Sequence, residues 1–202
     1  MSLPHALPAF TPKEYLSLER FSEIRHEYLD GLVYAMASES PNHSTICFNL
    51  AAVVGPQIKE SRCRGFSPNM KVRAGEKGLY AYPDLAVVCG EPIFHDEPRD
   101  VLINPTTIIE VLSPSTEAYD RGEKFLRYRT QIETLREYIL VSQDRPHVEY
   151  FSRQTDGSWL YTEVSGTDGV LSLPSINCEV RLADVYSRVT FPKESPSPPQ
   201  PN

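Results

Sequence analysis

The stretch "TTIIEVLSPSTEAYDRGEKFLRYRTQ" (residues 106–131) predicts a buried strand that leads directly into a helix. Its isoleucines and Val111 favour a strand over a helix, and the Ser-Pro pair that follows ends the strand. Two features of this stretch are unusual. Glu110 lies inside the apolar strand, and Lys124 follows Asp120 by one helical turn. An isolated ionised carboxylate is costly in an apolar environment, so Glu110 needs a partner.

The rest of the chain alternates between helical and strand patterns, which predicts an α/β domain with a mixed β-sheet flanked by helices. An N-terminal helix begins after Thr11 as its cap, and Asp30-Gly31 joins two strand-like runs into a β-hairpin over about residues 24–37. The other predicted elements are a helix over 40–61, strands over 66–74, 79–89 and 106–112, a helix over 115–131, and a strand meander over 135–164.

The length of 202 residues suits a single domain, which we place at residues 1–193, followed by a disordered Pro/Ser-rich tail over 194–202. A membrane span requires an apolar run of about 18 residues, and no run in this sequence is that long. The first residues lack the basic and apolar regions of a secretory signal. We therefore expect a soluble, cytoplasmic protein.

The charge and the cysteines exclude some classes of function. A net charge of −7 argues against a protein that coats nucleic acid through bulk charge, because that mode needs many Lys and Arg residues. A local basic groove would have to come from the clusters over 59–65 and 121–129. The four cysteines lie far apart with no C-x-x-C pair, which indicates neither a zinc site nor a disulfide framework. We expect them to be reduced and buried.

Two acidic residues on two apolar strands point to a metal site. Asp84 stands at the start of the run "DLAVV", and Glu110 stands inside "TTIIEVL". If these strands are neighbours, both carboxylates can bind one Mg²⁺, which prefers oxygen ligands. Such a metal would polarise a phosphoryl oxygen and lower the pKa of a bound water. Lys124 is the candidate cation for the charge that builds up on the phosphate.

Each of these residues also has an ordinary structural interpretation. Asp84 after Pro83 could end a turn, and Glu110 could pair with an arginine across the sheet. Asp120 and Lys124 could form a solvated ion pair. The order along the chain favours a shared site: a Pro-Asp on one strand, a Glu in the next buried strand, and a Lys shortly afterwards.

This order of residues resembles the PD-(D/E)XK nuclease superfamily, and more closely the Uma-type family of putative endonucleases, formerly a domain of unknown function. The resemblance is most specific at "EVLSPST" and "DRGEK". It also takes in "HEYLDGLVYAM", "SPNHSTICFNLA" and "REYILVSQD", and runs from about residue 10 to 190. It implies a restriction-endonuclease-like core.

The resemblance also implies a divalent metal, Mg²⁺ or Mn²⁺, held by Asp84, Glu110 and the backbone carbonyl of Val111. The usual lysine of the superfamily, two residues after the strand glutamate, would fall on Leu112, which is apolar. The family pattern places that lysine in the following helix, where it is Lys124 in this chain.

Three further residues carry two interpretations each. Glu27 matches a family glutamate that reaches the metal through a water, and it could equally be a surface charge of the hairpin. His43 could orient a phosphate or cap its helix. Tyr128, one turn beyond Lys124, could line the site or pack as a core aromatic.

The expected function is that of a metal-dependent endonuclease acting on nucleic acid, with DNA as the substrate and a homodimer as the assembly. The alternative is a catalytically inactive binding or regulatory module with the nuclease fold, which the net charge and the apolar Leu112 support. A serine or cysteine hydrolase is set aside, because there is no G-x-S-x-G elbow.

Overall fold

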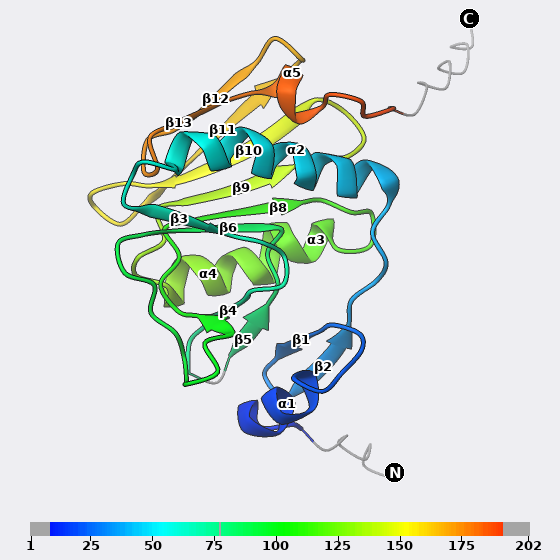
Figure 1. Cartoon of the computed structure of the whole chain (residues 1–202), viewed down its shortest axis with the longest axis vertical. Coiled ribbons are helices and arrows are strands. Elements are labelled where there is room, and N and C mark those ends of the chain that lie inside the picture. Colours follow the sequence, from blue (N-terminus) through cyan, green and yellow to red (C-terminus); the bar gives the residue numbers. More distant parts are fainter. Residues whose placement is uncertain (1–8, 77, 192–202) are drawn as a thin grey trace, which may run out of the picture.

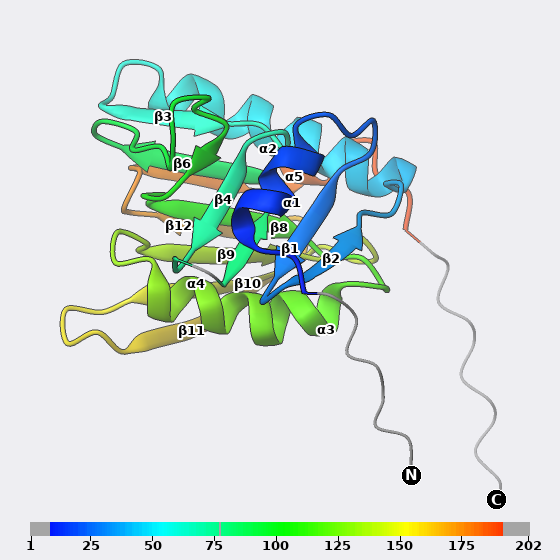
Figure 2. The ribbon, with the colours of Figure 1, turned by 90° about the horizontal axis from the view of Figure 1, so that it is seen from below.

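A computed structural model describes residues 9–76 and 78–191, and the tail expected over 194–202 lies outside them. A six-stranded mixed sheet forms the centre, with the long helix α2 on one face and the α3–α4 segment on the other (Figure 1). A five-stranded sheet packs beside α4, and the N-terminal helix α1 lies on it (Figure 2). The α/β class with an N-terminal helix and hairpin is confirmed.

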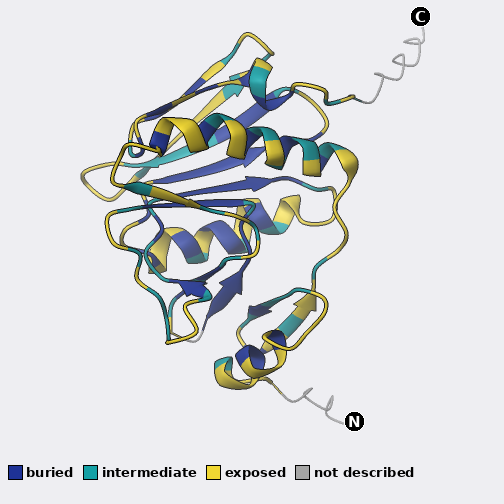
Figure 3. Cartoon of the chain, in the orientation of Figure 1, coloured by how far each residue is buried: buried dark blue, intermediate teal, exposed yellow. Residues whose placement is uncertain are grey.

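The six-stranded sheet has its most buried strands in the middle, as Figure 3 shows. Strands β8 and β9 pair in parallel, and the other neighbours are antiparallel. In spatial order the strands are β11 (Trp159–Ser165), β10 (His147–Arg153), β9 (Glu137–Val141), β8 (Thr107–Val111), β6 (Leu85–Cys89) and β3 (Cys63–Phe66).

The five-stranded sheet contains the predicted hairpin, which turns at Asp30-Gly31 with both residues at positive φ. Its strands in spatial order are β2 (Leu32–Ala35), β1 (His26–Leu29), β5 (Leu79–Ala81), β4 (Lys71–Ala74) and β7 (Val101–Leu102). Helix α1 (Pro12–Glu19) begins with the expected Thr11 cap, completed by the Glu14 side chain as a capping box.

The remaining elements cover the central sheet. They are α2 (Pro41–Ile58), α3 (Glu117–Tyr119), a π-helical turn (Asp120–Lys124), α4 (Phe125–Gln131), the strands β12 (Val170–Leu173) and β13 (Cys178–Arg181), and α5 (Leu182–Val185). The chain beyond residue 166 carried no predicted element, yet it covers the sheet face beside α2. Within the described chain, no helix has the length and apolar character needed to cross a membrane.

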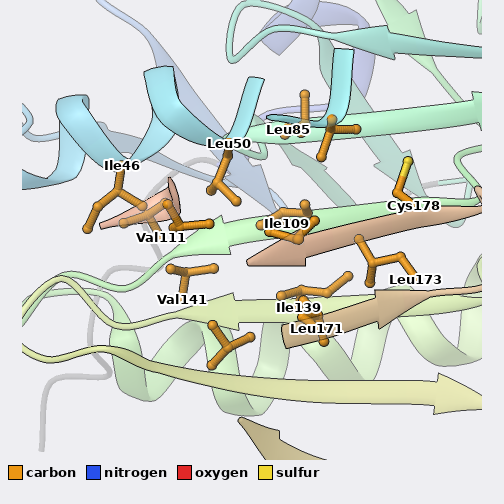
Figure 4. Close-up of a cluster of buried hydrophobic side chains, with 14 of the residues drawn as sticks. Ile46, Leu50, Leu85, Ile109, Val111, Ile139, Val141, Leu171, Leu173 and Cys178 are labelled. Carbon is orange, nitrogen blue, oxygen red and sulfur yellow. The ribbon is translucent and has the colours of Figure 1, made fainter. Parts of the chain in front are cut away.

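Alternation along the strands divides the core into two parts. Ile109 and Val111 of β8 face Ile46 and Leu50 of α2, as Figure 4 shows. Ile108 points to the opposite face, where it joins the buried side chains of α4 and of the five-stranded sheet. Glu110 therefore shares the Ile108 face, away from α2.

Two predicted strands were wrong in their extent. The run over 66–74 contains β4 and only the last residue of β3, which belong to different sheets. The run over 79–89 supplies two strands, β5 and β6, that also belong to different sheets. In this second run, the residues around Pro83 carry the chain from β5 into β6, because proline cannot donate a ladder hydrogen bond. Asp84 consequently lies at the crossing between the two sheets, immediately before β6.

Cys63 and Cys89 form a disulfide between β3 and β6, so the expectation that all four cysteines are reduced was wrong for this pair. The antiparallel register places the two residues opposite each other, with their Cα atoms 3.9 Å apart. Spacing along the chain does not reveal such a pair, because strand register decides it. Cys47 and Cys178 are free, and only Cys178 is fully buried.

Candidate metal and phosphodiester site

Three carboxylates converge on one lysine at the end of β8. The Lys124 Nζ lies 3.0 Å from Glu110 Oε1, 3.2 Å from Glu27 Oε1 and 3.3 Å from Asp120 Oδ1. The side chains of Lys124, Glu110 and Asp120 are each only 5% exposed, and that of Glu27 is 14% exposed. The interpretation of Asp120 and Lys124 as a solvated pair is therefore wrong.

Each member of this cluster is placed by a local feature of its own element. Glu110 is the penultimate residue of β8 and points to the face that α4 covers. Asp120 and Lys124 open and close the π-helical turn, a conformation that is frequent at functional sites. Glu27 comes from β1, where its Oε1 also accepts a hydrogen bond from the Tyr82 backbone N–H at 3.3 Å.

The electrostatics of the cluster favour an additional cation. Burial raises the pKa of Glu110 well above its ordinary value, Asp120, Asp84 and Glu27 raise it further, and Lys124 opposes this. Glu110 Oε1 is buried and accepts no hydrogen bond from any described residue, since its contact with Lys124 lacks hydrogen-bond geometry. A buried carboxylate oxygen without a donor is costly and needs compensation.

The surroundings of Lys124 favour its charged form. Burial alone would lower its pKa, but attraction to Glu110, Glu27 and Asp120 raises the pKa well above the ordinary value. Its position beside Glu110 matches the expectation drawn from the sequence. Asp84 is not one of its ion-pair partners in the described chain. The carboxylates around Lys124 thus favour the charged form of its side chain.

Asp84 lies at the same strand end, in contact with the start of α2. Its Oδ2 accepts a hydrogen bond from the Val111 backbone N–H at 2.7 Å and lies 3.4 Å from His43 Nε2. Asp84 is also close enough to raise the pKa of Glu110. Asp84 thus contacts the backbone of Val111, the residue that follows Glu110.

His43 lies near the N-terminus of α2, where its backbone N–H donates to the Ser40 cap at 3.1 Å. Burial acts to lower its pKa, but the hydrogen bond and attraction to Asp84, with help from Glu39, raise the pKa above the ordinary value. The His43 imidazole thus contacts a candidate metal ligand, and both of its expected roles stay predictions.

Cys47 adds a sulfur to this side of the site. It follows His43 by one turn of α2, and its Sγ lies 3.5 Å from His43 Nδ1. Ligand atoms of His43, Cys47 and Asp84 all lie within 4.8 Å of one another. Burial raises the pKa of the Cys47 thiol. A set of nitrogen, sulfur and oxygen donors suits Zn²⁺ better than Mg²⁺, unlike the carboxylates around Lys124.

Gln143 is a site residue that sequence reasoning missed. It is 6% exposed, its Nε2 donates to the Leu112 carbonyl at 2.9 Å, and its Oε1 accepts from Ser40 Oγ at 2.5 Å. These contacts fix the end of β8 to the start of α2. The only signal in the sequence was a polar amide two residues after the end of the buried strand β9.

Tyr128 is a core aromatic, as one of its two interpretations predicted, and its role in lining the site stays a prediction. The ring is fully buried in the core against Tyr138. Its hydroxyl has no hydrogen-bond partner among the described residues, and burial together with Glu110 raises its pKa while Lys124 opposes the shift. The structure thus brings Glu27, Glu110, Lys124 and the Tyr128 hydroxyl together, and the catalytic roles stay predictions.

Comparisons with known proteins bear on the family of the chain and on its fold. A family model described as "Putative restriction endonuclease" (Uma2) matches residues 12–184. An uncharacterized protein of Synechocystis sp., slr1290, is 33% identical over 189 residues, covering 91% of this chain and 95% of its own length. A second one from the same organism, sll1609, is 35% identical over 156 residues, covering 77% and 88%.

Among solved structures, a crystal structure of a putative nuclease belonging to DUF820 from Anabaena variabilis matches with a TM-score of 0.73. The match covers 90% of this chain and 99% of that chain at 21% sequence identity. At this identity the similarity shows the fold alone.

Proposed function

Because the chain belongs to the Uma2 family of putative restriction endonucleases, we propose that it hydrolyses phosphodiester bonds in DNA with Mg²⁺ or Mn²⁺ as cofactor. The observation that carries the proposal is the charge imbalance at the end of β8. Three carboxylates, those of Glu27, Glu110 and Asp120, surround one ammonium in a buried site. A structural ion pair would not require this excess of negative charge.

The donor set fits a hard divalent cation. Magnesium and manganese prefer carboxylate and carbonyl oxygens, and Glu110 Oε1 is a buried oxygen without a hydrogen-bond donor in the described chain. Asp84, Glu110 and the Val111 carbonyl would hold the ion, with Glu27 acting through a water. When bound, the ion supplies Lewis-acid polarisation of a phosphoryl oxygen and a lowered pKa for a bound water.

The side chains around this position have separate tasks in the proposal. Lys124 provides the fixed positive charge for the phosphate as negative charge develops on it. His43 and the Val111 backbone N–H hold the Asp84 carboxylate in one orientation through their contacts to Oδ2. Gln143 supports the strand end by binding the Leu112 carbonyl. The burial of the cluster limits access of bulk water to Glu110.

A plasmid-nicking assay tests the proposal. We expect the protein to nick supercoiled DNA with Mg²⁺ or Mn²⁺, and Glu110→Gln to lower the rate by at least about 100-fold, since a lost metal contact typically costs that much. Glu123→Gln is the matched control, because Glu123 precedes Lys124 but is exposed and pairs with Arg127 on the surface. Nicking that persists in both Glu110→Gln and Asp84→Ala would contradict the assignment.

A nuclease-fold binding module is the second candidate, supported by Leu112 at the usual lysine position, where it is a buried core residue. Calorimetric titration with Mg²⁺ separates the two functions. An active enzyme binds the ion and loses that binding in Glu110→Gln. A protein that neither binds Mg²⁺ nor cleaves DNA under any divalent ion is the module. We also propose that the protein is a homodimer and that it is located in the cytoplasm. Analytical sedimentation tests the oligomeric state.

A further inference from the structure

A cavity lies at the end of strands β8 and β9 that is opposite to Glu110. Its volume is about 590 Å³. Because β8 and β9 pair in parallel, both strands start at this end. The antiparallel strand β10 ends there, where the Arg153 backbone N–H donates to the Arg136 carbonyl at 2.8 Å. Residue Thr106, which precedes β8, lines the cavity, whereas Glu110 lies near the other end of that strand.

Three arginines line this cavity: Arg62 from the turn before β3, Arg136 from the start of β9, and Arg153 from the end of β10. None of the three forms an ion pair with a carboxylate in residues 9–76 and 78–191. Of the other arginines in the described chain, Arg20, Arg25, Arg121, Arg127 and Arg181 form such pairs and six do not. The three cavity arginines differ from those six because they line one cavity together. In a chain with a net charge of −7, this grouping of basic side chains favours an anionic ligand.

Backbone carbonyls, rather than acidic groups, hold two of these guanidinium groups in place. Arg136 Nη1 donates to the Glu133 carbonyl at 2.9 Å, and Arg153 Nη1 donates to the same carbonyl at 3.1 Å. Arg153 also stacks on the Trp159 ring, with its Cζ 5.1 Å from the ring centroid. Burial lowers the pKa of Arg153, the neighbouring Arg136 lowers it further, and Glu133 opposes both. The two positive charges are thus held close to each other without a carboxylate partner among the described residues.

The acidic group in the cavity wall already has its hydrogen bonds. Glu137 accepts from Thr107 Oγ1 at 3.1 Å, from the Ser175 backbone N–H at 3.1 Å, from the Ser175 hydroxyl, and from Tyr150 OH at 3.0 Å. These donors are neutral, so Glu137 offsets one positive charge at most. The cavity keeps an excess of positive charge that its own wall does not neutralise.

We propose that this cavity binds a phosphate group through Arg62 and Arg136, with Arg153 as a fixed positive charge behind them. Arginine is suited to this task because its planar guanidinium donates two parallel hydrogen bonds to a phosphate. The volume lies within the range of small-ligand sites and suits a mononucleotide. The phosphate belongs either to a free phosphate monoester or to a nucleic-acid backbone. Arg62 comes from the basic cluster over residues 59–65, so that cluster contributes to a local basic site.

Titration without divalent metal tests the proposal, with inorganic phosphate, adenosine monophosphate and an unphosphorylated DNA duplex as separate probes. The variant Arg62→Ala/Arg136→Ala should weaken the binding by at least about tenfold, because two charge-assisted contacts are lost. The matched control is Arg64→Ala/Arg145→Ala, which removes the same charge outside this cavity. Circular dichroism confirms that both variants fold.

The outcomes separate the two sources of phosphate. Binding of inorganic phosphate and the mononucleotide identifies a free monoester, and binding of the duplex alone identifies the nucleic-acid backbone. No binding of any probe, or an equal loss in the control variant, overturns the proposal. Glu110→Gln should bind inorganic phosphate or the mononucleotide with unchanged affinity, because Glu110 does not line this cavity. That result would separate the phosphate site from the proposed nuclease activity.

Discussion

Glu110 and Glu137 lie on the neighbouring strands β8 and β9, and both are buried, at 4% and 1% exposure. Glu137 accepts hydrogen bonds from Thr107, Tyr150 and Ser175. Glu110 Oε1 accepts none from the described residues and faces a lysine that two other carboxylates share. Burial alone therefore does not mark a functional carboxylate. The difference lies in whether neighbouring donors already satisfy its oxygens.

Lys124→Met should give the largest change in stability. It removes the ammonium from three buried carboxylates, so we expect the free energy of unfolding to fall by about 3–5 kcal/mol without metal. Urea unfolding in the presence of a chelator measures this. The double variant Lys124→Met/Glu110→Gln should recover part of the loss, because one of the stranded charges is gone. Additive losses in the double variant would mean that the two side chains are not coupled.

Glu137→Ala tests the comparison at the carboxylate whose oxygens already accept hydrogen bonds. It strands several buried donors, so we expect a loss of about 2–3 kcal/mol in the free energy of unfolding, with Mg²⁺ affinity unchanged. Glu110→Gln should show the reverse pattern, with little loss of stability and no Mg²⁺ binding. Chemical unfolding and calorimetry on the two variants measure both quantities. A stable Glu137→Ala protein with weakened Mg²⁺ binding would remove the distinction.

The smallest expected change in stability concerns Asp100. Here two cations, Arg20 and Lys71, pair with one carboxylate, whereas at Lys124 three carboxylates surround one cation. Although burial raises the pKa of Asp100, hydrogen bonds from Arg20 and Lys71 lower the pKa from 3.8 to about 2. Its stabilisation is therefore present above pH 3.8 and is lost as the pH falls towards 2. For this partly exposed group we expect less than about 1 kcal/mol.

The measurement for Asp100 is the pH dependence of unfolding. Asp100→Asn should lower stability at pH 7 by that small amount and should flatten the loss between pH 3.8 and 2 relative to the unchanged protein. A variant that follows the same acid curve as the unchanged protein would show that Asp100 contributes nothing to it.

Local features of the fold could be predicted from the sequence, and sheet membership could not. The Thr11 cap and the Asp30-Gly31 turn depend on neighbouring residues only, so both were predicted correctly. The run over 79–89 looked like one strand because its apolar character is continuous. Its division between two sheets depends on long-range pairing, as does the disulfide between Cys63 and Cys89.

The candidate site shows the same limit. Glu110 and Lys124 could be singled out because a charge in a buried strand and a lysine in the family order are visible in the sequence. The burial of Asp120 was not predicted, because an i,i+4 pair looks the same on a solvated and on a buried helix face. Gln143 was missed because its two partners, Leu112 and Ser40, come from distant parts of the chain.

The origin of Glu27 in the N-terminal hairpin has a kinetic consequence. The hairpin meets the segment from Asp120 to Gln131 through Glu27 with Lys124 and through Asp30 with Arg127, a pair separated by 97 residues. Closing so long a loop is slow compared with forming local structure. During refolding, the central sheet can therefore form before the third carboxylate arrives. The charge cluster is completed only when the hairpin docks, so its formation marks a late step of folding.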